Sequence, residues 1–280
     1  MKSSQLAVGL AVLALLTGCT VSPELREQQD EFSVVLELEK VTGVVFATAA
    51  DTVQIDLDRP TDEVVETAFA VRDVFVDAAE RLPELLLSDL TLFTVRPGDW
   101  EVLTSLTTDR LDDASLESLV ISWVALVHLD VESASVRVTE YEPRNGTVVI
   151  NEWRTDRPPS AVLASIADGL DAVPLPTEST ELWVYLVEAT VSIADGTRAP
   201  DGLGESLDGL RALDYIRYMI IQVTGEGTSV VLFTTDPIVP EQSSEVLGIF
   251  ERLGLLDEML TVSTSGPGTS GDLVLWGATP

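Results

Sequence analysis

The stretch TDEVVETAFAVRDVFVDAAERLPELLLSDLTLFTVRPGDWEVLTSL, residues 61–106, decides the fold because it holds one complete helix and strand pair. Asp62 and Glu63 fall where negative charge favours a helix start. After them, apolar residues recur with the helical period on one stripe: Val64, Ala68, Val71, Phe75, Ala78 and Leu82. Residues 89–95 and 100–106 then read as strands around the turn residues Pro97-Gly98-Asp99. We therefore expect a helix followed by a β-hairpin.

The same order recurs along the whole chain. Helical patterning also begins near Glu24, Asp112, Ser160, Gly204 and Pro240. Strand pairs follow at 136–141 with 147–153, 219–224 with 228–234 and 260–264 with 272–276, and a shorter pair precedes Pro60. Residues 182–194 hold no turn residue and read as one long strand. This predicts an α+β fold of tandem αββ units, which form antiparallel sheets with helices packed on one face.

Pairs of units predict three αββαββ modules, at residues 24–108, 109–200 and 201–280. The arrangement is similar to ferredoxin-like and BON-type envelope modules, in pattern and without a signature motif. The alternative is an α+β protein whose element spacing is only approximately periodic. The glycine-rich stretches 202–209 and 266–271 lack the lysine of a phosphate loop, so we expect ordinary loops there.

The N-terminus carries a targeting pattern. Lys2 precedes an apolar run from Leu6 to Leu16, which as a helix spans roughly 16 Å and is too short for a ~30 Å hydrocarbon core. The run closes with Leu16-Thr17-Gly18-Cys19, which resembles the lipobox of bacterial lipoproteins. The resemblance implies that residues 1–18 are a signal peptide that is removed, that Cys19 is lipidated, and that residues 19–23 form a short tether. It implies a lipid-anchored protein on the extracytoplasmic face of the cell membrane. The alternative is an ordinary secreted protein.

Composition excludes several functions. Cys19 is the only cysteine, so the chain has no disulfide and, once lipidated, no thiol nucleophile. The net charge of −31 repels nucleic acid and anionic lipid headgroups, so we expect no nucleic-acid partner. His128 is the only histidine, which excludes metal sites that need two histidines and gives no sign of a Ser-His-acid triad.

Carboxylates and tryptophans are the remaining candidates for a site. Asp56, Asp58, Asp62 and Glu63 resemble a calcium-ligand spacing, but the required glycine is missing and Arg59-Pro60 interrupts the run. We therefore expect no metal and no cofactor. Trp123 lies on a helical stripe and is expected in the core. Three tryptophans at strand ends could form a flat platform for sugar rings or a partner protein: Trp100, Trp153 and Trp276.

These observations predict a non-catalytic lipoprotein of the cell envelope that binds or scaffolds. Its partner would be an envelope protein or a glycan, held through uncovered sheet faces or hairpin edges. One alternative is a carrier or chaperone for an apolar or glycolipid ligand, which would need a cavity of roughly several hundred Å³. Another is an envelope hydrolase, which would need two carboxylates facing one cleft.

Overall fold

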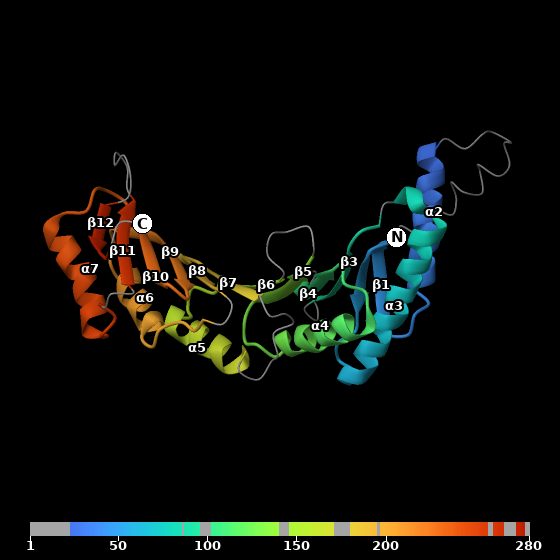
Figure 1. The fold of residues 1–280 in the computed structure, drawn as a ribbon, viewed down its shortest axis with the longest axis horizontal. Coiled ribbons are helices and arrows are strands. Elements are labelled where there is room, and N and C mark those ends of the chain that lie inside the picture. The colour runs from blue at the N-terminus through green and yellow to red at the C-terminus, as the bar shows by residue number, and fades with distance from the viewer. Residues whose placement is uncertain are drawn as a thin grey trace.

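The computed structural model describes residues 23–85, 87–95, 102–139, 146–170, 180–194, 197–256, 260–265 and 273–277. Cys19 and the rest of the targeting pattern, the tether up to residue 22, Trp100 and the stretch 266–271 lie outside these residues. The described chain forms six αββ units in an arch, with the strands on its inner side and the helices on its outer side (Figure 1).

The units follow one another in chain order. Their elements are α2 (Pro23–Leu38), β1 (Val44–Ala49), β2 (Thr52–Ile55); α3 (Thr61–Arg81), the 3₁₀ turn η1 (Pro83–Leu85), β3 (Leu90–Val95), β4 (Val102–Thr108); α4 (Asp113–Leu126), β5 (Ser133–Val138), β6 (Gly146–Glu152); α5 (Pro159–Leu170), β7 (Thr180–Leu186), β8 (Ala189–Ile193); α6 (Leu203–Arg211), β9 (Ile216–Thr224), β10 (Gly227–Thr234); and α7 (Pro240–Arg252), β11 (Leu260–Ser265), β12 (Leu273–Trp276).

All twelve strands belong to one sheet, in sequence order from β1 to β12. The α+β class and the tandem αββ units are thus confirmed. Each hairpin is antiparallel, as expected, but successive hairpins join in parallel, at β2–β3, β4–β5, β6–β7, β8–β9 and β10–β11. The sheet is therefore single and mixed. The reason is the helix between two units, which returns the chain to the end where the previous strand began, so the next strand runs parallel to it.

Hydrogen bonding in the sheet continues across both expected module boundaries. Thr104–Thr108 pairs with Ala134–Val138, and Ala189–Ile193 pairs with Met219–Val223. The helix layer is less continuous: α2, α3 and α4 pack in series, as do α5, α6 and α7, whereas packing between α4 and α5 is sparser. The division into three modules stays a prediction.

The prediction of one long strand over residues 182–194 is wrong. The chain reverses at Val187–Glu188, and Leu182 pairs with Ile193 across the β7–β8 hairpin. This turn contains no glycine, proline or asparagine, so no local signal marks it. Its position follows from tertiary pairing, since β7 is held by β6 and β8 by β9.

Of the two expectations for residues 202–209, the helix beginning near Gly204 is confirmed and the loop is wrong, because α6 covers Leu203–Arg211. Its glycines serve close packing. A Cβ atom on Gly204 would lie 2.6 Å from the Cα atom of Ser160, at the start of α5. The amide and hydroxyl of Ser160 both donate to the carboxylate of Asp208 on α6, the amide at 3.2 Å. The two helices therefore touch through their backbones.

We expect Gly204→Ala to lower the free energy of unfolding by about 1–3 kcal/mol, because the added methyl meets backbone that cannot rotate away. Gly248→Ala on α7 is the matched control. A Cβ atom there meets only the far end of Arg252, at 3.8 Å, so helix propensity alone predicts a gain of about 0.5–1 kcal/mol. Urea denaturation of both variants measures the difference. Equal shifts of the midpoint would contradict a backbone contact between α5 and α6.

The core lies between the helices and the face of the sheet that they cover. Trp123 on α4 is fully buried there, as predicted. One row of buried side chains on this face runs through paired positions of successive strands: Ala47, Val53, Leu92, Leu106, Val136, Val148 and Leu182. No helix among the described residues is both long enough and apolar enough to span a bilayer.

Candidate functional site

The opposite face of the sheet, which we call the open face, is not covered by any of the described helices (Figure 1). Side chains alternate along a strand, so this face is lined by the residues between the buried ones. One of its rows passes through paired positions from β1 to β11: Phe46, Gln54, Phe93, Ser105, Ser135, Val149, Trp183, Ser192, Gln222, Ser229 and Thr261. The row is built mainly of aromatic, hydroxyl and amide side chains.

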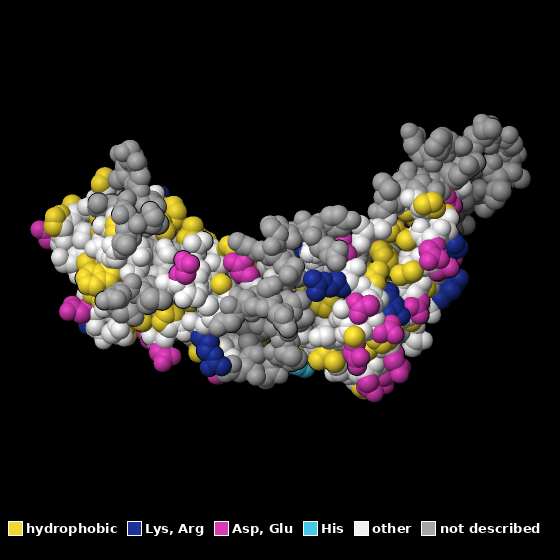
Figure 2. Space-filling view, in the orientation of Figure 1, with side chains coloured by type: hydrophobic (Ala, Val, Ile, Leu, Met, Phe, Trp, Pro, Cys, Tyr) yellow, Lys and Arg dark blue, Asp and Glu magenta, His cyan; other side chains and the backbone are white. Residues whose placement is uncertain are grey.

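The open face is almost free of charge. The twelve described strands contain four charged residues, two arginines and two glutamates, which are Arg137, Glu152, Glu181 and Arg217. Their charges cancel, so the net charge of −31 resides in the helices and the rest of the chain. Figure 2 shows acidic side chains gathered over the region of α3. A neutral surface in so acidic a protein indicates a place where another molecule can approach without repulsion.

Aromatic side chains gather on the open face between β7 and β10. The rings of Trp183 and Tyr185 are stacked, with centroids 6.1 Å apart and planes at 16°. Tyr218 and Phe233 face each other across β9 and β10, with centroids 6.3 Å apart. Thr190 connects the two pairs, since its backbone pairs with Tyr185 and its hydroxyl is hydrogen-bonded to that of Tyr218. We call these five residues the aromatic patch.

Exposed apolar residues also lie at the ends of strands, outside the aromatic patch. Glu152 and Leu186 form the last pair of the β6–β7 ladder, and Trp153 and Val187 directly follow them. Trp153 is 51% exposed and Val187 is 39% exposed. Trp276, at the end of β12, is 39% exposed, but it pairs with the buried Val262 and so lies on the helix-covered face of the sheet. Two of the three tryptophans expected at strand ends are therefore available at the surface.

A second aromatic pair lies at the other end of the open face. Phe46 and Phe93 meet edge to face, with centroids 6.0 Å apart, and Gln54 occupies the position between them. Gln54 is buried, and its Oε1 atom has no hydrogen-bond partner. A buried acceptor left unpaired destabilises a protein by about 1–3 kcal/mol, so Gln54 lowers the stability of this end of the sheet.

An ion-pair network positions Trp153. The carboxylate of Glu152, only 1% exposed, accepts from Arg154 Nε at 2.6 Å and from Arg157 Nη1 at 3.0 Å. Both arginines also pair with Asp130, in the loop between α4 and β5. The backbone amide of Trp153 donates to Glu132 Oε2 at 2.8 Å. The network thus fixes the end of β6 against that loop.

The network also sets the pKa of Glu152. Burial raises this pKa, but the hydrogen bonds and charge of Arg154, with the charge of Arg157, outweigh burial. The pKa of Glu152 therefore lies below its ordinary value of 4.5. The carboxylate is held ionised, so it serves as a structural anion and not as a proton donor near neutral pH.

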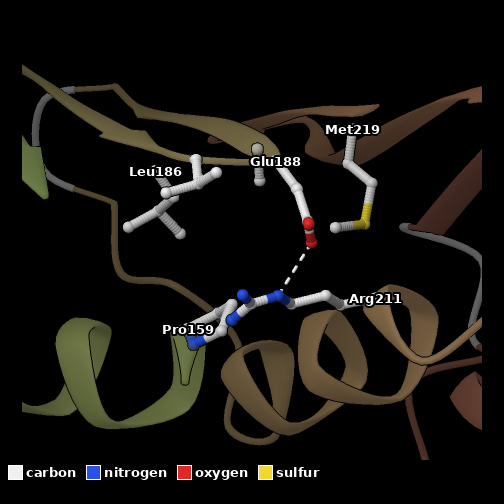
Figure 3. Close-up of a pocket in the computed structure, with 7 residues that line it drawn as sticks. Pro159, Leu186, Glu188, Arg211 and Met219 are labelled. Carbon is white, nitrogen blue, oxygen red and sulfur yellow. Dashed lines mark ion pairs between the residues drawn. The ribbon is translucent and has the colours of Figure 1, made fainter. Parts of the chain in front are cut away.

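A small pocket lies behind the aromatic patch, under the β7–β8 turn (Figure 3). Pro159, Leu186 and Met219 line it, and Arg211 Nε closes it through an ion pair with Glu188 at 2.7 Å. Its volume is about 10 Å³, which holds one water molecule at most. This pocket is too small for the ligand of a carrier. A larger hollow of about 460 Å³ lies beside Arg72 and Asp113, but it is open to solvent and lined mainly by charged side chains, which does not suit an apolar ligand.

The other sequence candidates remain apart from the open face. His128 lies in the turn after α4, away from the strands. Asp56, Asp58 and Asp62 precede or begin α3, and the described part of the chain contains no group of three acidic, histidine or cysteine side chains arranged to hold a metal ion.

Sequence reasoning missed the aromatic patch. Trp183 and Tyr185 alternate with Leu182, Val184 and Leu186, which is the signal for aromatic residues on one face of a strand. Treating residues 182–194 as one strand concealed that Trp183 and Tyr185 lie near Tyr218 and Phe233.

The chain matches no family model, no curated protein and no solved structure.

Proposed function

We propose that this protein is a lipid-anchored, extracytoplasmic binding or scaffold protein of the cell envelope. It has no catalytic role, and it holds its partner on the open face, centred on the aromatic patch. The observation that carries the proposal is the coincidence of three properties on this face within the described part of the chain: no covering helix, almost no charge, and clustered aromatic side chains.

The composition of this surface matches a protein-binding surface. The cores of protein interfaces are depleted in charged residues and enriched in tyrosine, tryptophan and phenylalanine. A sheet of twelve strands at about 4.8 Å spacing is roughly 50 Å long, and strands of about six residues on average make it roughly 20 Å wide. This face, on the order of 1,000 Å², is comparable to the ~800 Å² that each partner contributes to a standard interface. An envelope protein is therefore the favoured partner, and a neutral glycan is the second candidate.

Attachment follows from the N-terminal pattern. Lipidation at Cys19 would hold the body within a few residues of the bilayer, because α2 begins at Pro23. The acidic surface then repels anionic headgroups, an effect limited to about 8 Å at physiological salt. The tether therefore keeps the body close to the membrane, while the repulsion keeps it off the headgroups. The neutral face stays free for a partner.

Photocrosslinking in intact cells tests whether a partner binds to the open face. A photoreactive amino acid replaces Gln222, which is exposed on the open face, or Glu205, which is exposed on α6 in the same unit. We expect a discrete crosslinked species from Gln222 and none from Glu205. A crosslinked polysaccharide would show that the partner is a glycan and not a protein. The proposal fails if crosslinking is absent at Gln222 or equal at the two positions.

A further inference from the structure

The two ends of the sheet have unusual edges. Among the described strands, β1 and β12 each pair with one neighbour, and their sequences, VVFATA and LVLW, contain no charged residue and no proline. Soluble proteins usually protect edge strands with charges, proline or a covering element, because unpaired backbone groups recruit further strands.

Apolar side chains are exposed around both edges. In the first unit Leu36 is 41% and Val45 54% exposed. In the last unit Val239 is 47%, Leu253 37% and Trp276 39% exposed. Repeat proteins generally need polar terminal units to stay soluble; here the helices α2 and α7 supply polar residues to the terminal units, whereas the edge strands β1 and β12 are uncharged.

The internal joins of the sheet supply a geometry for pairing these ends. At five positions the second strand of one unit pairs in parallel with the first strand of the next. β12 is the second strand of the last unit, and β1 is the first strand of the first unit. We propose that β12 of one molecule pairs in parallel with β1 of a second copy, which continues the repeat from molecule to molecule.

This contact uses two different surfaces, so it leaves a free β1 at one end and a free β12 at the other and builds open chains. The join is weak. β12 is four residues long, and both edge pairings contain a register shift that reduces the regular ladder. Like charges on the acidic bodies oppose it further. We therefore expect reversible chains that form where molecules are concentrated, as on a membrane surface.

Thiol crosslinking tests this arrangement in the protein as the cell processes it. One variant carries both Val45→Cys on β1 and Leu275→Cys on β12, and two control variants carry one change each. With a short bismaleimide on the cell surface, the double variant should give a ladder of dimers, trimers and longer species. Each single variant should give no more than the background that the unaltered chain shows through Cys19. A crosslinked dimer from a single variant above that background, or no ladder from the double variant, overturns the proposal.

Sedimentation of the purified full-length protein in detergent supplies an independent measurement. Val45→Lys places a charge on the β1 edge, and Val76→Lys places one on α3, at a side chain 38% exposed. Val45→Lys should shift the species present at high concentration to the monomer, whereas Val76→Lys should leave self-association unchanged. Circular dichroism confirms that both variants are folded. Equal sedimentation of the two variants, or a monomer in the unaltered protein at all concentrations, contradicts the proposal.

Discussion

Replacing Cys19 by serine is expected to abolish lipid labelling and to release the protein from the membrane. The sulfur atom is the proposed point of attachment, and serine cannot form the thioether. Each buried methylene of an acyl chain contributes about 0.8 kcal/mol to membrane binding, so losing two or three chains removes a lasting anchor. The effect on membrane attachment is therefore close to all or none.

Labelling of cells with radioactive palmitate, followed by vesicle sedimentation, measures the change. Thr20→Ser is the matched control, because it alters the neighbouring residue by one methyl and leaves Cys19 intact. It should keep full labelling. If Cys19→Ser were labelled as strongly as the unaltered protein and sedimented with vesicles to the same extent, the lipobox interpretation would be wrong.

Replacing Glu152 by glutamine is expected to lower the free energy of unfolding by about 3 kcal/mol. Glu152 is 1% exposed and takes hydrogen bonds from Arg154 and Arg157, so the neutral amide leaves two cations without their buried partner. Breaking a buried pair typically costs about 3–5 kcal/mol. The lower end applies because the Arg154 side chain is 37% exposed and stays partly hydrated. Urea denaturation at pH 7 gives the value.

Asp130→Asn is the control within the same network. Asp130 pairs with the same arginines, but its side chain is 73% exposed, so we expect a loss of no more than about 1 kcal/mol. Comparable losses in the two variants would mean that burial does not govern this network.

The pH dependence of the Glu152 effect has a defined sign. The pKa of Glu152 is lower in the folded protein than its ordinary value of 4.5. The stabilisation by the ionised carboxylate is therefore complete above pH 4.5 and is lost as the pH falls through the lowered pKa. We expect the stability difference between the unaltered protein and Glu152→Gln to be constant from pH 7 to about pH 5 and to shrink below about pH 4.5. If the stability difference between the two proteins grew on acidification, the pKa of Glu152 would not be lowered in the folded protein.

The helices were predictable because their signals are local. The apolar stripe from Val64 to Leu82 and the first-turn acids place α3 within a residue of its observed ends. At Asp112 the expected start is made by a side chain that accepts from the amide of Ser115 at 3.0 Å. Such patterns depend on neighbours three and four residues away, so the sequence alone contains them.

Features that depend on distant strands were not predictable in this way. The turn at Val187–Glu188 has no turn-forming residue. The helical pattern of α6 was visible from Gly204, but the packing role of its glycines appears only where Ser160 lies against Gly204. The hairpins join into one sheet through parallel pairing between units. The alternation of apolar and polar residues within a strand does not indicate which other strand it pairs with. The aromatic patch was missed for the same reason, since only the register of β7, β8 and β9 brings Tyr185 close to Tyr218.

Oxidative footprinting with hydroxyl radicals tests the central claim most directly, because it reports the solvent access of individual side chains. The oxidation rates of Trp183, Tyr185, Tyr218 and Phe233 would be compared between the purified protein and the protein on intact cells, with His128 as the reference outside the open face. We predict that the four aromatic residues are protected several-fold on cells while His128 is unchanged. Equal rates on cells and in solution would contradict a partner on the open face.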